Sequence, residues 1–377
     1  MRVLSLSLTG FRSYSDLRLE LPAGPQVIVG PNAAGKTNLL EALVVLSRGA
    51  SHRAAADLEV VRWGAPFARA DVEIDHGSGR SIDRLEATIE RTGPTQARKR
   101  LQVNGVARRA AGLAETLRVV LFAPEEMLLV VGGPALRRGT IDTLASARSP
   151  THARASATYA RALQQRNGLL RRIREGEAER DQLPYWDRIV VEEGGVIVAE
   201  RLALLADLAP AIASAHAEIA PEEGGLALRY VTNAPAGAAE SPADAIRRRL
   251  AETADKEVWN GATLIGPHRD DVVFELDGRD LAGFASRGQQ RTAILSLKLA
   301  ELDLLTAPDG EPPLLLLDDV FSELDPDRRA HLVRRIRSLP QAIVTTTTLG
   351  DLDPALVAES TAWQVGGGAV VPAKSAV

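Results

Sequence analysis

The 377-residue sequence contains no cysteine, which excludes disulfide bonds and thiolate metal sites. Its six histidines are scattered, and no two of them stand four residues apart, as a metal-binding pair on one helix face would. Aromatic residues make up only 4% of the chain, so the sequence offers no platform on which nucleic-acid bases would stack. These absences exclude several classes of site and leave a chemistry based on oxygen and nitrogen ligands.

Long apolar runs are also missing, since none approaches the roughly 20 residues of a membrane span. Residues 1–6 alternate like a strand and lack the features of a signal peptide, so we expect a cytoplasmic protein. The net charge of −4 provides no overall basic field, and any contact with DNA must come from local patches. The length suffices for about two domains.

The most informative stretch is residues 30–37, which fit the phosphate-loop pattern Gly-x4-Gly-Lys-Ser/Thr at every fixed position. An apolar run precedes it and helix-forming residues follow it, which is the strand–turn–helix context of a nucleoside triphosphate site. We expect Lys36 to reach the β- and γ-phosphates and the Thr37 hydroxyl to bind Mg²⁺. The expected ATP-binding residues are Gly30, Pro31, Asn32, Ala33, Ala34, Gly35, Lys36, Thr37 and Asn38.

A second half of this site follows the apolar run 314–317, which is typical of a central parallel strand. Asp318 and Asp319 come directly after it. A carboxylate at the end of a strand beside a phosphate loop can hold Mg²⁺, so we expect Asp318 to share the metal with Thr37. Asp319 is expected to polarise the attacking water and, with Lys36, to form the catalytic pair.

The rest of the chain falls into three sections. Alternating and apolar patterns predict strands near residues 1–8, 17–21, 67–75, 83–91, 101–105 and 342–345. We expect the N-terminal part of the ATPase head in 1–125, a helical arm in 126–255 and the C-terminal part of the head in 256–377. No heptad pattern is sustained, which argues against a long coiled coil. The tail from residue 366 onward is weakly patterned.

Between the two halves of the site, residues 286–290 read Ser-Arg-Gly-Gln-Gln directly before a helix. By itself this segment favours a capped helix with a flexible turn. The order of motifs, however, resembles that of the ABC-type ATPases, and the resemblance implies an α/β head with a mixed sheet and a short helical arm. It further implies that Ser286, Gly288 and Gln289 bind the γ-phosphate held by another subunit, and that Asp325 lies in a loop at the dimer interface.

The resemblance narrows to the RecF family of bacterial recombination-repair proteins. It is carried by residues 30–42, 51–53, 124–125, 165–170, 266–271 and 286–290. It implies a slow, Mg²⁺-dependent ATPase that dimerises with ATP and clamps double-stranded DNA at gaps or stalled forks. The implied partners are RecR, RecO and RecA, and the implied process includes the SOS response.

The sequence also departs from the ABC pattern. Asp319 stands where a glutamate is usual, and Thr346 or Thr347 stands where the switch histidine is usual. No glutamine loop is recognisable, so a slow switch fits better than a fast motor. Arg53 is a candidate nucleotide contact by its place in RecF-like chains, or else an exposed loop arginine. His268 is expected to have a structural role in a turn.

Four arginine-rich clusters can contact DNA phosphates, or can simply be solvated faces. They are residues 98–100, 108–109, 137–138 and 171–172. The alternative to the RecF-like function is the ATPase subunit of another ABC-type system. A transporter subunit would usually carry the switch histidine and lack the helical insertion, and a long-armed repair ATPase would carry a Cys-x-x-Cys hook.

Overall fold

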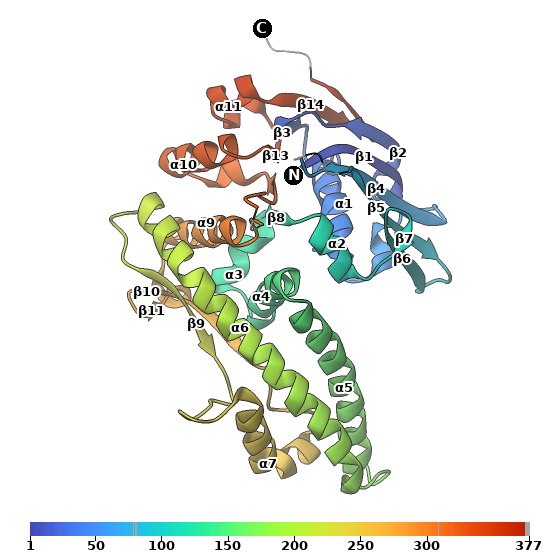
Figure 1. The fold of residues 1–377 in the computed structure, drawn as a ribbon, viewed down its shortest axis with the longest axis vertical. Coiled ribbons are helices and arrows are strands. Elements are labelled where there is room, and N and C mark those ends of the chain that lie inside the picture. The colour runs from blue at the N-terminus through green and yellow to red at the C-terminus, as the bar shows by residue number, and fades with distance from the viewer. Residues whose placement is uncertain (78, 80, 308, 374–377) are drawn as a thin grey trace. The chain divides into compact units, whose positions relative to one another are not determined.

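The computed structural model describes residues 1–77, 79, 81–307 and 309–373. The chain forms two compact units, one made of residues 1–127 and the residues from 294 onward, the other of residues 128–293. Figure 1 shows the elements of both. The sequence placed the breaks after residues 125 and 255, whereas the structure assigns 256–293 to the second unit. The reason is that β10 in this segment pairs with β9 of the arm.

The first unit contains a mostly parallel sheet in the order β15-β14-β3-β13-β12-β8. Its central strands are completely buried, which explains their continuous apolar sequences. Strand β14 was not predicted; it adds to β3 in parallel, and β15 returns antiparallel to it. The strands are β3 (Gly24–Val29), β8 (Val119–Phe122), β12 (Leu314–Asp318), β13 (Gln341–Thr346), β14 (Thr361–Gly366) and β15 (Ala369–Pro372). The last four residues of the weakly patterned tail lie outside the described ranges.

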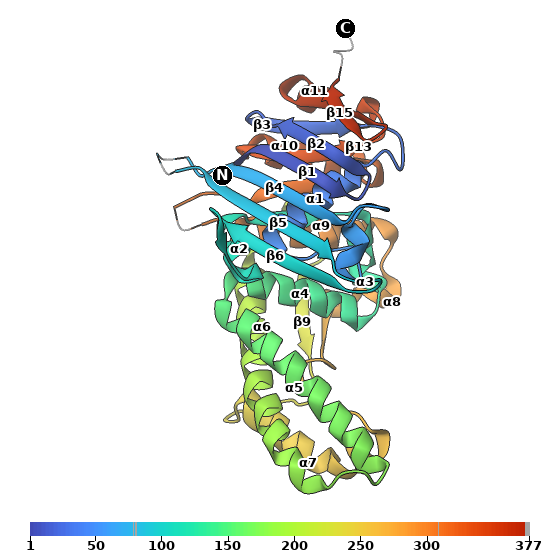
Figure 2. The same cartoon turned by 90° about the vertical axis from the view of Figure 1, so that its right-hand side faces the viewer.

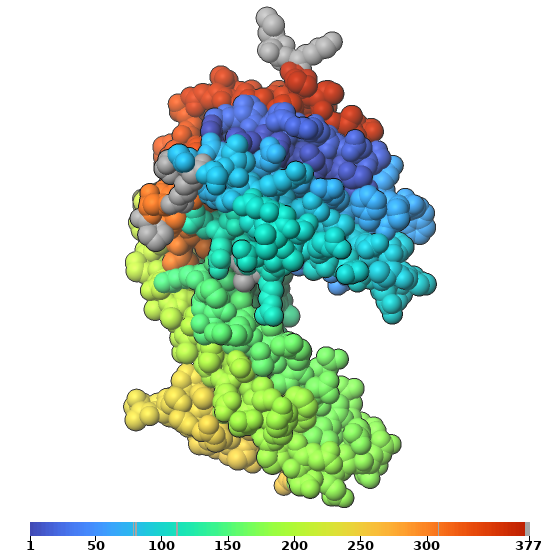
Figure 3. Space-filling model, turned by 45° about the vertical axis from the view of Figure 1, so that its right-hand side comes forward, coloured from blue at the N-terminus to red at the C-terminus, as the bar shows by residue number. Residues whose placement is uncertain are grey.

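A second, antiparallel sheet has the order β2-β1-β4-β5-β6-β7 (Figure 2). Its strands are β1 (Arg2–Phe11), β2 (Tyr14–Glu20), β4 (Phe67–Asp75), β5 (Asp83–Arg91), β6 (Ala97–Val103) and β7 (Val106–Ala107). Most of them alternate between buried and more exposed positions, as expected for a sheet with one face on the core. The chain around residue 100, cyan in Figure 3, lies on the surface of this unit.

Helix α1 (Lys36–Arg48) packs against strands of both sheets and is buried along most of its length. It begins at the phosphate loop and ends at Gly49, which adopts φ 69°. The short α2 (Ala110–Thr116) packs on α1 and β6, while α10 (Pro326–Arg337) and α11 (Pro354–Glu359) contact β3. The expected head, with an antiparallel sheet beside the nucleotide-binding one, is therefore present.

The second unit is mainly helical. Its main helices are α4 (Pro134–Arg148), α5 (Pro150–Arg174), α6 (Leu183–Ile219) and α7 (Pro242–Asn260), and a small sheet has the order β11-β10-β9. The strands are β9 (Leu226–Val231), β10 (Asp271–Leu276) and β11 (Arg279–Asp280), and α3 (Leu128–Val131) and α8 (Leu281–Phe284) are short helices. The boundary between the units falls within α9 (Arg287–Leu304). Within the described ranges, no helix combines the length and the apolar character needed to cross a membrane.

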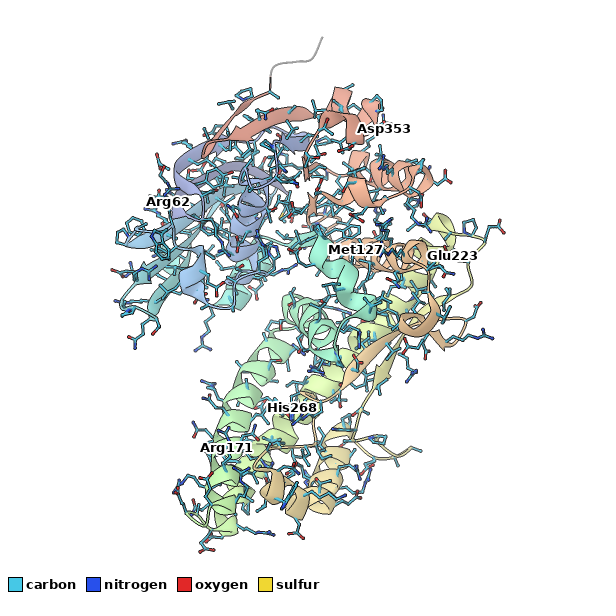
Figure 4. All side chains as sticks on the ribbon, turned by 180° about the vertical axis from the view of Figure 1, so that it is seen from behind. Arg62, Met127, Arg171, Glu223, His268 and Asp353 are labelled. Carbon is cyan, nitrogen blue, oxygen red and sulfur yellow. The ribbon has the colours of Figure 1, made fainter. Side chains whose placement is uncertain are left out.

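Two of the segments that carry the resemblance, 165–170 and 266–271, make contacts within this unit. The buried Arg166 of α5 forms an ion pair with Glu257 of α7, its Nη2 lying 2.7 Å from Oε2, and donates to Asp187 of α6. His268 lies among the side chains of the second unit (Figure 4), where its ring joins Tyr159 to the backbone of Thr263. The structural role expected of His268 is confirmed.

Candidate nucleotide-binding site

The phosphate loop lies between β3 and α1, and its conformation requires glycine at residue 35. Gly35 has φ 113°, and a Cβ atom there would lie 2.8 Å from Ser13 Oγ and 2.9 Å from Tyr14 Oη. Both are closer than a side chain tolerates, so only glycine lets the loop pass this point. The backbone N–H groups of such a loop face inward, which makes it a cradle for phosphate oxygens.

Lys36 is buried, and its ammonium group is directed back over the loop. Its Nζ atom donates to the Gly30 carbonyl at 2.7 Å and to the Pro31 carbonyl at 3.1 Å. An ammonium group has three donors, so one remains for a phosphate oxygen while these two fix the side chain. This geometry suits the expected role of Lys36. The Asn38 side-chain amide donates a hydrogen bond to Ser13 Oγ at 2.9 Å, and thereby positions a residue that lies against the phosphate loop at Gly35.

Asp318 joins the two halves of the site. Its Oδ1 atom accepts hydrogen bonds from the Thr37 hydroxyl at 3.2 Å and from the Thr345 hydroxyl at 2.6 Å. The structure therefore brings together a hydroxyl and a carboxylate, which are oxygen ligands of the kind that Mg²⁺ prefers. Among the described residues, no group of three or more His, Cys, Asp or Glu is arranged so that it could hold a metal ion. Mg²⁺ in nucleotide sites takes one or two carboxylates plus substrate phosphates and waters, so Thr37 and Asp318 fit it.

Asp319 directly follows in the left-handed backbone region, with φ 53°. Aspartate tolerates this conformation better than most side chains. Its backbone N–H donates to the Thr345 carbonyl at 3.2 Å and to Thr345 Oγ1 at 3.1 Å. Burial, the largest cause, raises the pKa of the Asp319 carboxyl, and the charge of Asp318 adds to this, while Lys36 opposes it. A raised pKa makes the carboxylate a better acceptor for a proton from water.

Thr346 and Thr347 follow at the end of β13. The Thr346 carbonyl accepts from the Gly30 N–H at 3.3 Å, which places this residue beside the phosphate loop. Its hydroxyl donates to the Thr348 carbonyl at 2.9 Å, and the Thr347 hydroxyl lies 3.5 Å from Asp351 Oδ2. Thr346 is thus positioned next to the loop, while both hydroxyls have local acceptors.

A buried carboxylate that the motif analysis did not single out for chemistry organises the loop after α1. Glu41 accepts two hydrogen bonds from Arg12, at 2.6 and 2.8 Å, and one from the Ser51 hydroxyl at 2.5 Å. Burial alone would raise the pKa of Glu41, but these hydrogen bonds and the Arg12 charge lower it below its ordinary value. The Arg53 guanidinium lies 3.9 Å from the same carboxylate and remains partly exposed. Glu41 therefore restrains Arg53 while leaving it accessible.

His52, between Ser51 and Arg53, is a further residue to which the sequence assigned no role of its own. Both ring nitrogens are buried, and neither has a hydrogen-bond partner among the described residues. Burial, followed by the charge of Arg48, lowers the pKa of His52 to about 4, while the charge of Asp318 acts in the opposite direction. The imidazole is therefore neutral at physiological pH. No spacing rule in the sequence signals such a residue, because its burial is a property of the folded chain, and of the charged groups that act on it Asp318 comes from a distant segment.

The remaining predicted residues occupy helix N-termini. Ser286 and Gln289 form a reciprocal capping box at α9: Ser286 Oγ accepts from the Gln289 N–H at 3.2 Å, and Gln289 Oε1 accepts from the Ser286 N–H at 3.0 Å. The adjacent Gly288 is half-buried, and its carbonyl accepts from Thr292. Asp325 caps α10 by accepting from the Arg328 N–H at 3.0 Å. Ser286 belongs to the second unit, whereas the phosphate loop belongs to the first.

The chain is similar to known proteins over nearly its whole length. The family described as RecF/RecN/SMC N terminal domain matches residues 2–359. The DNA replication and repair protein RecF of Roseiflexus castenholzii is 38% identical and is aligned over 99% of this chain and 100% of its own. A solved structure of the recombination mediator protein RecF with ATP, from the RecFOR pathway, has a TM-score of 0.88 and 28% identity over 99% of this chain and 97% of its own.

An Smc head solved with the C-winged helix domain of ScpA shares the fold alone, with a TM-score of 0.53 and 14% identity over 100% of this chain and 98% of its own. The match to RecF with ATP and this likeness together confirm the ABC-type head that the motif order implied.

Proposed function

This chain belongs to the RecF family of DNA replication and repair proteins, and from that membership we propose how it works. Two copies bind ATP and close head to tail on duplex DNA at gaps or stalled forks. Slow hydrolysis then opens the pair and releases the DNA. The cycle is a switch: the pair is closed while ATP is bound and open after ATP has been hydrolysed.

The site residues divide the work of this cycle. The phosphate loop and Lys36 bind the triphosphate, and Thr37 and Asp318 hold Mg²⁺. When bound, Mg²⁺ neutralises charge on the phosphate oxygens. Asp319 orients water and accepts its proton, while Ser286 and Gly288 of the second copy complete the site from the other side. The short reach of the Asp319 side chain makes hydrolysis slow.

We propose RecR, RecO and RecA as the partners of this step, so that the chain assists RecA loading and SOS induction in the cytoplasm. Support comes from the ATP-bound relative, which is a recombination mediator protein of the RecFOR pathway. The alternative, an ATPase subunit of another ABC-type system, is disfavoured because the RecF relatives match the helical unit as well as the head.

The observation that carries the proposal is a pair of hydrogen bonds beside the phosphate loop. The hydroxyls of Thr37 and Thr345 both donate to Oδ1 of Asp318. This pair connects the nucleotide to β12 and β13, and thus to the segments that lead to Asp319 and Asp325. Loss of the γ-phosphate would then change the contacts at the ends of both β12 and β13.

The test uses Lys36→Ala and fluorescence anisotropy of a labelled duplex with ATP, with ADP and without nucleotide. Losing a charged hydrogen bond to phosphate weakens ATP binding by about 2–3 kcal/mol, so we expect ATP-dependent duplex binding to disappear. Lys256→Ala, which removes an exposed lysine of α7, serves as the matched control. Equal duplex binding by the unaltered protein with and without ATP would contradict the proposed gating.

A further inference from the structure

One stretch of the first unit carries basic residues without any acidic ones. Between residues 91 and 114 the sequence contains no acidic residue, although the whole chain has a net charge of −4. The same stretch carries six basic residues, namely Arg91, Arg98, Lys99, Arg100, Arg108 and Arg109. A local excess of this kind is the electrostatic feature by which an otherwise acidic protein can attract a polyanion.

The fold places this stretch at the edge of the antiparallel sheet. It runs from the end of β5 through β6 and β7 to the start of α2, and β6 and β7 are the last strands in the sheet order. All six basic residues are exposed, and the segment lies on the surface in Figure 3. We call this surface, defined by the six residues, the basic edge.

Most of these side chains have no acidic partner. Lys99 pairs with Asp57 at 3.0 Å, whereas no ion pair among the described residues involves Arg98, Arg100, Arg108 or Arg109. Two carboxylates of β5 share a face with Arg98 and Arg100: Glu90 stands opposite Arg98 in the register, and Glu86, opposite Gln102, forms an ion pair with Arg69. The guanidinium groups are therefore available to another molecule.

The other arginine clusters differ in this respect. Arg137 makes two hydrogen bonds to Asp271 and further ones to three carbonyl groups, so it stabilises the second unit. Arg138 donates to the Asp270 carbonyl. Residues 171–172 are followed closely by four acidic residues, at 175, 177, 179 and 181, which reduce the local positive charge. Of the four clusters that the sequence indicated, only the two on the basic edge lie in an exposed stretch that contains no acidic residue of its own.

The spacing on β6 suits a phosphate backbone. Arg98 and Arg100 are two residues apart, so both point to the same face of the strand. Their Cα atoms are about 7 Å apart along the strand. Lys99 points to the other face, where it meets Asp57. No aromatic residue occurs between 91 and 114, so the surface offers charge without a base-stacking platform.

We propose that the basic edge binds the phosphate backbone of duplex DNA. This inference rests on the proposed function, and adds to it the surface of the chain that meets the DNA. Exposed charges also protect edge strands from pairing with other sheets. Acidic and basic side chains can both do this, and if it were the only role of the basic edge, removing charge there would leave the DNA affinity unchanged.

The experiment compares the full chain with Arg98→Gln/Arg100→Gln in duplex binding by anisotropy, with ATP and at several salt concentrations. Log affinity falls with log salt concentration, and each lost phosphate contact makes this slope less steep by about 0.9. The double variant should therefore reduce the steepness of the slope by about 2 for each chain that contacts the duplex. The affinity at 0.1 M salt should fall about tenfold or more. ATP binding, measured in parallel, should be unchanged. Arg171→Gln/Arg172→Gln removes the same charge and should leave both the slope and the affinity unaltered.

The outcomes separate the two proposals. If the unaltered protein fails to bind duplex with ATP, the proposed function is wrong and this inference falls with it. If it binds, but the Arg98/Arg100 variant retains the same affinity and slope, DNA binding stands and the basic edge is excluded. A loss of single-strand binding with duplex binding unchanged would also overturn the assignment.

Discussion

His268 shows how the fold fixes the state of a single side chain. Its Nε2 atom lies 3.1 Å from the Thr263 carbonyl, which can only accept, so Nε2 carries the proton. Nδ1 is then the acceptor for the Tyr159 hydroxyl, 2.7 Å away. Burial, the largest cause, lowers the pKa of His268 to about 4 from an ordinary value of 6.5. The neutral ring is thus part of the folded second unit.

The pH dependence follows from this depressed pKa. Below pH 6.5 the unfolded chain takes up a proton at His268 that the folded chain does not, so the stability from the neutral ring is complete above 6.5 and is lost as the pH falls towards 4. An NMR titration of the histidine ring signals, assigned with His268→Gln, should give a midpoint well below 6. A midpoint near 6.5 would show that the ring is solvated and the hydrogen-bond network is wrong.

At the residue scale, the sequence predicted positions best where spacing alone defines them. Lys36, Thr37 and Asp318 could be placed at one expected site, because a phosphate loop and a strand-end carboxylate have fixed positions relative to their elements. Glu41 and His52 could not, because their surroundings combine segments that are far apart in the sequence. A buried charge or an unpartnered ring is a tertiary property with no local pattern.

At the scale of elements, the N-terminus of α9 has two expected roles that can be separated. The Ser286 hydroxyl caps the helix in this structure, and the proposed function also assigns it to the γ-phosphate of a second copy. Replacing the cap costs about 1 kcal/mol, which the chain can tolerate. A bulky cation at an exposed position would instead block close approach of a second copy.

Ser286→Arg should therefore retain ATP binding by the monomer and lose ATP-dependent dimerisation. Ser286→Asn, which keeps a capping side chain, controls for the helix terminus. Nucleotide affinity is measured by fluorescence of a labelled ATP analogue and mass by sedimentation velocity. Loss of ATP binding by the Ser286→Arg monomer would argue against a signature that acts across the interface.

Elements were predicted best where the residue pattern was regular, and the alternating segments 67–75 and 83–91 became β4 and β5 with the same bounds. The run at 314–317 and the strand near 342–345 became β12 and β13, because central parallel strands are buried on both faces and need continuous apolar sequences. Strand β14 escaped prediction, since its residues are half-buried or exposed except Val365. The extent of the second unit was also missed, because it depends on the pairing of β10 with β9 across about forty residues of chain.

At the scale of the whole molecule, both halves of the expected nucleotide site lie in one unit and the expected signature lies in the other. The phosphate loop, Asp318 and Asp319 belong to the first unit, and Ser286 and its neighbours to the second. In the proposed cycle, ATP completes the site by joining two copies, and hydrolysis at Asp319 ends the joined state. Blocking hydrolysis while preserving ATP binding should then accumulate the dimer.

The most direct measurement is the solution mass of Asp319→Asn by light scattering, with and without ATP and a short duplex. The amide keeps the shape of the side chain but cannot accept the proton from water, so ATP should persist. We expect a monomer without nucleotide, a dimer with ATP, and a larger dimer fraction when duplex is added. A mass that stays constant under all conditions, with DNA affinity unchanged by ATP, would contradict the proposed cycle.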